Sequence, residues 1–129
     1  MVSFTCFQFL TDVPRNQSYI TIVCFFWQVL VVGCGNSELS EQMYDVGYKR
    51  LTNIDISETV VTHMNQRNAE RRPNLTFQQV DATQTHYEDA LYQACLDKGT
   101  LDAMASEEDG ALARRMLAEV GQLTYTKKT

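Results

Sequence analysis

The amino-acid sequence predicts an α/β fold built on a doubly wound parallel sheet. Short apolar runs alternate with polar segments of helical periodicity along the chain, which is the order expected when helices connect parallel strands. Each predicted strand also leads into a glycine or an acidic residue. Open sheets of this kind bind their ligands at the carboxyl edge, where such residues would collect. With 129 residues, the chain is long enough for one domain.

The first predicted strand is the aliphatic run at 29–32, which stops at Gly33. A continuous run of this length is typical of a strand buried on both faces of a parallel sheet. Helix-forming residues fill the segment 37–46, and Gly47 follows it. Because glycine commonly ends a helix, we expect a helix over 37–46.

The second strand is predicted at 50–57, where the apolar residues alternate until Asp55 breaks the pattern. Ser57 is then placed to cap a helix, because its hydroxyl can accept a hydrogen bond from an unpaired backbone N–H. Pro73 forces an end to that helix. The apolar face that we expect it to bury consists of Val60, Val61 and Met64.

The third and fourth strands are predicted at 75–83 and 91–99, with Asp81 and Asp97 at their carboxyl ends. A last helix is expected after Ser106, since acidic residues stabilise a helix N-terminus. The apolar residues that follow recur at helical spacing. The acidic residues and the apolar stripe of this helix are Glu107, Glu108, Asp109, Leu112, Met116, Val120 and Leu123.

The composition argues against several classes of protein. There are 16 acidic and 11 basic residues, a net charge of −5, whereas a broad nucleic-acid surface needs clustered lysine and arginine. The apolar run at 20–32 is shorter than the roughly 20 residues that cross a bilayer, so we expect no membrane partner. No C-x-x-C pair occurs, so neither a metal site nor a disulfide framework is expected from the cysteines, which are Cys6, Cys24, Cys34 and Cys95.

A candidate ligand site begins at the turn that contains Gly33 and Gly35. Glycine permits a sharp turn and lets a ligand approach the main chain, although a G-x-G sequence alone is equally consistent with a tight turn. Asp55 follows the next strand, where a carboxylate can accept both hydroxyls of a ribose. Asp81 follows the third strand and is placed to face an adenine amino group. Taken singly, each aspartate could be a helix-entry or turn residue; together they predict a site for an adenosine-containing ligand.

Two kinds of adenosine-containing ligand fit this pattern. A dinucleotide site would have a third glycine where this chain has Glu38, whose charge would repel a pyrophosphate at the helix N-terminus. An NAD-dependent oxidoreductase is therefore disfavoured. S-adenosylmethionine carries no phosphate, and Ser37 supplies the small residue that its loop prefers. The residues favour S-adenosylmethionine as the cofactor.

The segments VLVVGCGNS, NIDIS, VDAT and LDKGTLDAM resemble class I S-adenosylmethionine-dependent methyltransferases, whose fold is a Rossmann-like sheet of seven strands. The longer strings GCGNSELSEQMYDVGY and LDKGTLDA resemble the methyltransferase-like 13 group, known as elongation factor 1-alpha lysine and N-terminal methyltransferase. The resemblance covers residues 29–121, which implies a partial methyltransferase domain, truncated at both ends, with about four of the seven strands. Residues 1–28 and 122–129 resemble nothing in the family.

The resemblance also implies roles for individual residues. Gly33 and Gly35 would border the methionine moiety, Asp55 would hold the ribose, and Asp81 with Ala82 would border the adenine. The complete set of cofactor-binding residues that it implies is Gly33, Cys34, Gly35, Asn36, Asp55, Ile56, Asp81, Ala82 and Asp97.

The activity that the resemblance implies is methylation of lysine on elongation factor 1-alpha, in the cytoplasm. Asp97 and Lys98 are the candidate catalytic residues, because they would lie where the methyl donor meets the substrate. Asp97 could position the acceptor amine, and Lys98 would orient the substrate or be a solvated surface lysine. The alternative is a truncated, catalytically inactive fragment that binds the cofactor.

Overall fold

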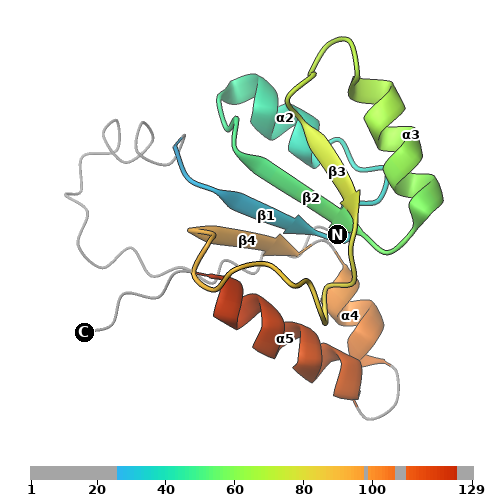
Figure 1. Cartoon of the computed structure of the whole chain (residues 1–129). Helices are drawn as coiled ribbons and strands as arrows, with labels where there is room; N and C mark the ends of the chain where they lie inside the picture. Colours follow the sequence, from blue (N-terminus) through green and yellow to red (C-terminus); the bar gives the residue numbers. More distant parts are fainter. Residues whose placement is uncertain (1–25, 98, 107–109, 125–129) are drawn as a thin grey trace.

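The computed structural model describes residues 26–97, 99–106 and 110–124. Its strands form a parallel sheet in the order β3-β2-β1-β4, with helices on both sides (Figure 1). The predicted α/β class and doubly wound parallel sheet are thus confirmed. In chain order the elements are β1 (Val29–Val32), α2 (Leu39–Val46), β2 (Leu51–Asp55), α3 (Glu58–Asn68), β3 (Thr76–Gln79), β4 (Ala94–Asp97), α4 (Thr100–Ala105) and α5 (Ala111–Leu123).

The register of the strands brings their carboxyl ends to one edge. Val32 of β1 pairs with Ile54 of β2 and with Asp97 of β4, while Asp55 pairs with Gln79 of β3. The chain runs from β1 through β2 to β3 and then crosses to the other side of β1 to form β4. The winding direction therefore reverses between β1 and β4, which is where sheets of this kind bind ligands.

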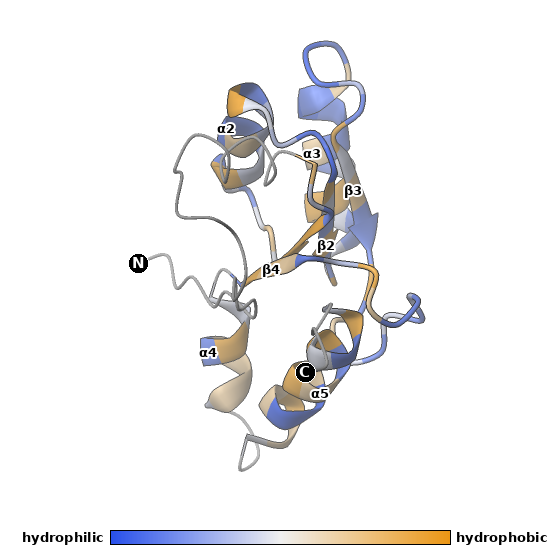
Figure 2. Ribbon diagram, turned by 90° about the vertical axis from the view of Figure 1, so that its left-hand side faces the viewer, coloured by the Kyte–Doolittle hydropathy of each residue, from blue (hydrophilic) through white to orange (hydrophobic). Residues whose placement is uncertain are grey.

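Helices cover both faces of the sheet. Figure 2 shows α2 and α3 on one side and α4 and α5 on the other. Because successive side chains of a strand point to opposite faces, β1 serves two cores. Val29 and Val31 lie in the core beneath α2 and α3, and Leu30 and Val32 lie in the core beneath α5. Burial on both faces explains why β1 is aliphatic throughout.

The first two described helices begin and end for reasons that the sequence contains. Gly47 follows α2 with a φ of 125°, a conformation that other residues resist. The Ser57 hydroxyl accepts a hydrogen bond from the backbone N–H of Val60 at 3.3 Å and so caps α3. α3 ends at Asn68, ahead of Pro73. The predicted helix, its cap and its stop are confirmed.

The strands are shorter than predicted. β3 covers four residues of the predicted 75–83, because its ladder ends where its partner β2 ends, at the pair of Gln79 with Asp55. β4 likewise covers four residues of the predicted 91–99. Tyr92 lies before β4 and makes only an isolated bridge, to Thr124. Apolar and β-branched residues outside the ladder extend the predicted strands too far, since pairing sets strand ends.

The helices after β4 differ from the prediction in two ways. The sequence does not predict α4, because this helix has six residues and buries none of them completely. The last helix begins at Ala111, after Gly110, and the acidic residues expected at its start lie outside the described residues, as does Lys98. Met116, Val120 and Leu123 are buried as predicted. None of the helices seen in the described ranges combines the length and the apolar character needed to cross a bilayer.

Candidate functional site

A cavity of about 260 Å³ opens at the carboxyl edge of the sheet, and we refer to it as the carboxyl-edge cavity. The ends of β1 and β2 and the turn after β3 form one wall, and residues of α4 and α5 form the other. Small-molecule pockets typically occupy roughly 300–1,000 Å³, so this cavity suits part of a cofactor, such as a nucleoside. The predicted site residues that line it are Gly33, Asp55, Ile56, Asp81 and Ala82.

Gly33 allows α4 to approach the end of β1. Its φ is 65°, and a Cβ atom at this position would lie 1.5 Å from the Thr100 hydroxyl oxygen. A side chain in place of the hydrogen of Gly33 would therefore force Thr100 to move. The glycine is required by the packing of two elements as well as by the turn.

Gly35 has a different role in the same turn. Its φ is 52°, and a Cβ atom there would meet nothing within 4 Å. Its N–H donates a hydrogen bond to Asp55 Oδ2 at 3.0 Å. The glycine therefore leaves space beside the main chain while its N–H binds the acid at the end of β2. That space is what a ligand approaching the backbone would need.

Asp55 is held by two backbone donors from different elements. Oδ2 accepts from Gly35, and Oδ1 accepts from the N–H of Ser57 at 2.9 Å. A carboxylate has about four lone-pair positions, so each oxygen keeps capacity for a further donor. These two bonds orient the carboxylate between the glycine turn and α3.

Asp81 is ordered by the turn that follows it. Its Oδ1 accepts from the Thr83 hydroxyl at 2.7 Å and from the Thr83 N–H at 2.8 Å. These two bonds, the hydroxyl's first, hold the pKa of Asp81 below its usual value, so the carboxylate is ionised near neutral pH. An ionised carboxylate can only accept hydrogen bonds, which suits an amino-group donor on a ligand.

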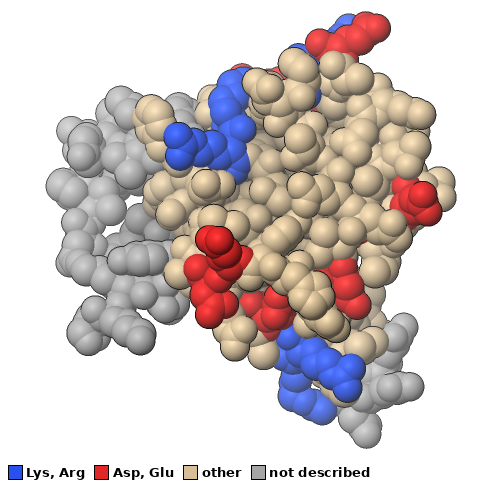
Figure 3. Space-filling view, in the orientation of Figure 1, with Lys and Arg blue, Asp and Glu red and all other residues tan. Residues whose placement is uncertain are grey.

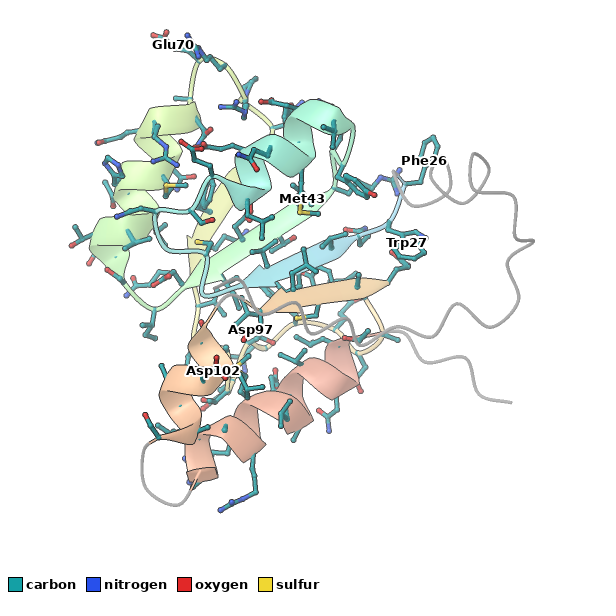
Figure 4. The ribbon with its side chains drawn as sticks, turned by 180° about the vertical axis from the view of Figure 1, so that it is seen from behind. Phe26, Trp27, Met43, Glu70, Asp97 and Asp102 are labelled. Atoms are coloured by element: carbon teal, nitrogen blue, oxygen red, sulfur yellow. The ribbon has the colours of Figure 1, made fainter. Side chains whose placement is uncertain are left out.

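Asp97 is buried at the end of β4, and 2% of its surface is exposed. Burial raises the pKa of its carboxyl group, and the nearby charge of Asp102 acts in the same direction. The backbone N–H groups of Leu101 and Thr100 partly offset that rise, with Leu101 at 3.3 Å from both carboxylate oxygens. Figure 4 shows Asp97 and Asp102 close together, on β4 and α4. Asp97 does not line the carboxyl-edge cavity.

Three other predicted residues also lie outside the cavity lining. Cys34 is 3% exposed and belongs to the core beneath α2 and α3. Asn36 is exposed, and its carbonyl oxygen accepts from Arg67 Nη2 at 3.4 Å. Gly35 does not line the cavity, but its N–H donates a hydrogen bond to Asp55, which does. Glu38 precedes the first turn of α2 and is exposed.

The second wall of the cavity consists of residues that sequence reasoning missed. Thr100 and Met104 come from α4, and Leu112 comes from α5. The sequence predicts Leu112 only as part of an apolar helix face. Nothing in the spacing of these residues marks them as cavity residues, because the tertiary packing of α4 and α5 brings them to the site.

Several acidic side chains lie along the connection from β3 to β4. Figure 3 shows them on the lower half of the face in view, over the connection from β3 to β4. The exposed acids of that connection are Asp81, Glu88 and Asp89. Of these three, Asp81 lies at the carboxyl edge and lines the cavity, whereas Glu88 and Asp89 lie on the return toward the amino end of β4. Lysine and arginine side chains lie just below the acids in the same view, so this face carries both signs of charge.

The fold and site together define a class: a parallel α/β domain with a glycine turn and two acids at the carboxyl edge of its sheet. Residues 29–121 match the family described as "Methyltransferase domain". The chain belongs to this family.

Known relatives are similar over the same region. The chain is 80% identical over 96 residues to the eEF1A lysine and N-terminal methyltransferase of Danio rerio and 54% identical over 99 residues to that of Homo sapiens. Both matches cover 74% of this chain and 14% of the relative. The chain thus spans about one seventh of the length of the curated relatives that it matches.

A solved structure supports the fold. The PH0226 protein from Pyrococcus horikoshii OT3 superposes with a TM-score of 0.63 at 19% identity, covering 85% of this chain and 55% of that one. At this identity the similarity concerns the fold alone.

Proposed function

We propose that this chain is the cofactor-binding part of an S-adenosylmethionine-dependent protein-lysine methyltransferase that acts on elongation factor 1-alpha. One observation supports the choice of cofactor: Gly33, Asp55 and Asp81 line a single cavity. The N–H of Gly35 also donates a hydrogen bond to Asp55. The names of the curated relatives support the substrate. The cytoplasmic location is part of the proposal and rests on the resemblance.

The residues present fit S-adenosylmethionine. Asp55 would accept the ribose hydroxyls, and Asp81 would accept the adenine amino group. The open space beside Gly35 would admit the methionine portion. When bound, the cofactor supplies a methyl group already activated on a sulfonium. The remaining work of the protein is to hold the acceptor close and aligned, which can lower a barrier by up to about 7–11 kcal/mol.

Asp97 would position the acceptor amine. A lysine must lose its proton before it can attack a methyl group. The buried carboxyl of Asp97 is a stronger base than an exposed aspartate, because burial raises its pKa. It could therefore hold the amine and accept its proton. Lys98, also predicted at this point, keeps its proposed role in orienting the substrate.

Titration calorimetry with S-adenosylhomocysteine tests the cofactor, and transfer of a tritiated methyl group to elongation factor 1-alpha tests the reaction. Asp55→Ala should abolish measurable binding, because it removes the acceptor between the glycine turn and α3. Asp45→Asn is the matched control, since Asp45 is an exposed acid of α2 that binds Arg72. If the wild-type chain fails to bind S-adenosylhomocysteine, the proposal is wrong.

A second candidate is a domain that binds the cofactor without turning over. The described sheet has four strands, and β4, which carries Asp97, lies at its edge. Groups that would complete an acceptor site beyond β4 are not among the described residues. Binding of S-adenosylhomocysteine without transfer of label would favour this candidate over the enzyme.

A further inference from the structure

Glu119 of α5 binds the loop that follows β3. Its Oε1 accepts a hydrogen bond from the Thr85 N–H at 3.0 Å and from the Thr85 hydroxyl at 2.6 Å. Thr85 is 6% exposed, and its hydroxyl oxygen also accepts from the N–H of Tyr87 at 3.2 Å. Because buried donors need partners, Glu119 is required to satisfy both donors of Thr85.

Two further bonds attach the same connection to the end of α5. The N–H of Ala90 donates to the carbonyl oxygen of Gln122 at 2.8 Å, and the N–H of Tyr92 donates to that of Leu123 at 3.0 Å. These are main-chain contacts, so a substitution does not remove them. The bonds from Thr85 to Glu119, in contrast, end on a side chain, so a substitution of Glu119 removes them.

The segment held by Glu119 continues directly from the cavity wall. Asp81, Ala82 and Thr83 line the carboxyl-edge cavity, and the N–H of Gln84 donates to the Asp81 carbonyl oxygen at 3.0 Å. Thr85 is the next residue.

The backbone on the far side of Thr85 is strained. His86 has a φ of 62°, which is unfavourable for a residue with a Cβ by about 1–2 kcal/mol. Such a conformation persists only when surrounding contacts hold it. Glu119 supplies contacts of this kind from α5, and they act on Thr85, which lies between the turn that carries Asp81 and His86.

We propose that Glu119 is a positioning residue for the nucleobase: through Thr85, it holds the 81–84 turn in the conformation in which Asp81 faces the cavity. The inference rests on the proposed function, because the nucleobase is that of the proposed cofactor. On this proposal a residue of α5, which belongs neither to the glycine turn nor to a strand end, contributes to selectivity for the nucleobase.

The contact permits a matched pair of variants. Both bonds end on a single oxygen of Glu119, so Glu119→Gln keeps an accepting oxygen and Glu119→Ala removes it. Glu70→Ala is a control at an exposed glutamate, which Figure 4 shows at one end of the molecule, away from Asp97 and Asp102.

The affinities of S-adenosylhomocysteine and S-inosylhomocysteine test the proposal. In the second ligand a carbonyl oxygen replaces the adenine amino group, so position 6 of the base accepts a hydrogen bond and cannot donate one to Asp81. The wild-type chain should prefer the adenine ligand. Glu119→Ala should reduce that preference about tenfold, which corresponds to about 1.4 kcal/mol, while Glu119→Gln and Glu70→Ala keep it. Equal weakening of both ligands, or no change in either, would overturn the proposal, because a purely structural role does not distinguish the bases.

Amide hydrogen exchange separates this inference from the proposed function. Glu119→Ala should accelerate exchange at Thr85 and Tyr87 and leave Ala90 and Tyr92 protected, since the main-chain bonds of these two remain. If the wild-type chain binds neither nucleoside, the proposed function fails. Independently of binding, an unchanged exchange rate at Thr85 in Glu119→Ala would show that Glu119 does not hold the loop.

Discussion

The two helical layers of this molecule are attached to the sheet by different means. Between α2 and α3, Glu41 accepts hydrogen bonds from Arg67 Nε at 2.7 Å and from Asn68 Nδ2 at 2.9 Å, and it is 8% exposed. On the other face, α5 packs mainly through apolar residues, and α4 buries none of its residues completely. Thr100 of α4 lies so near Gly33 that a Cβ atom on this glycine would be 1.5 Å from the threonine hydroxyl oxygen.

This difference separates the parts of the site that local hydrogen bonds and caps hold in place from the parts that depend on the packing of helices. The layer with α2 and α3 presents the glycine turn and Asp55, and capped helices and an ion pair hold it together. The layer with α4 and α5 supplies the other wall of the cavity. That wall forms only if α4 can approach the end of β1.

Gly33→Ala should have the largest effect on stability. The new Cβ would overlap the Thr100 hydroxyl and the residue would have to keep a φ of 65°, so we expect a loss of about 3 kcal/mol in the free energy of unfolding. Urea denaturation measures it. Gly35→Ala is the control: it has a similar φ but open space, and should lose only about 1 kcal/mol. Equal losses would mean that α4 does not need Gly33.

Glu41→Gln should weaken the other layer by about 1–2 kcal/mol at pH 7, because hydrogen bonds to a charged acceptor become bonds to a neutral one. Burial acts to raise the pKa of Glu41, but the bonds from Arg67 and Asn68 and the nearby arginine charges together hold it below its usual value.

The difference in stability between wild type and Glu41→Gln should depend on pH, because the pKa of Glu41 is lowered in the folded state. A carboxyl group whose pKa is lower in the folded state stabilises the fold above its unfolded pKa of about 4.3, and that contribution is lost as the pH falls through the folded value. The stabilities of wild type and Glu41→Gln should therefore converge below about pH 4. Denaturation curves from pH 7 to pH 3 measure this. A gap that stays constant would exclude an ionised Glu41 as its source.

Ser57→Ala should have a smaller effect, a loss of about 1 kcal/mol, because it removes the cap of α3. Asp55 still accepts from the backbone N–H at residue 57, so cofactor affinity should change little. Thermal denaturation and calorimetry on the same variant check both statements. A large loss of affinity with little loss of stability would mean that the cap orients Asp55.

Asp45→Asn should be the mildest change, with no resolvable loss of stability. Asp45 forms two bonds with Arg72, at 2.5 and 2.9 Å, but the pair lies at the surface, where water and salt screen it. Comparison with Glu41→Gln in the same denaturation assay separates the loss of a buried acid from the loss of an exposed acid in the same layer. A loss as large as that of Glu41→Gln would contradict this distinction.

Much of the layer with α2 and α3 could be predicted from the sequence because its signals are local. Gly47 ends a helix and Ser57 begins one through contacts within a few residues. The parallel order follows from the alternation of apolar runs with helical segments. Asp55 and Asp81 could be placed at one edge because parallel strands all end on the same side.

The other wall of the cavity could not be predicted in this way. α4 is a short helix without a local signature, and Thr100 reaches the site only because Gly33 lacks a side chain. The family resemblance implies a cofactor contact for Cys34, and the structure places its side chain in the core. The sequence does not single out Glu119, since its partner Thr85 is 34 residues away along the chain.

By itself, the sequence determined the fold class, the glycine turn and the acids that follow the strands, because hydrophobic periodicity and backbone preferences act over a few residues. Only the tertiary structure decided where each strand ends, which side chains of the turn face the cavity, and how α4 and α5 complete it. These features depend on contacts between residues far apart in the chain, and no short stretch of sequence specifies such contacts.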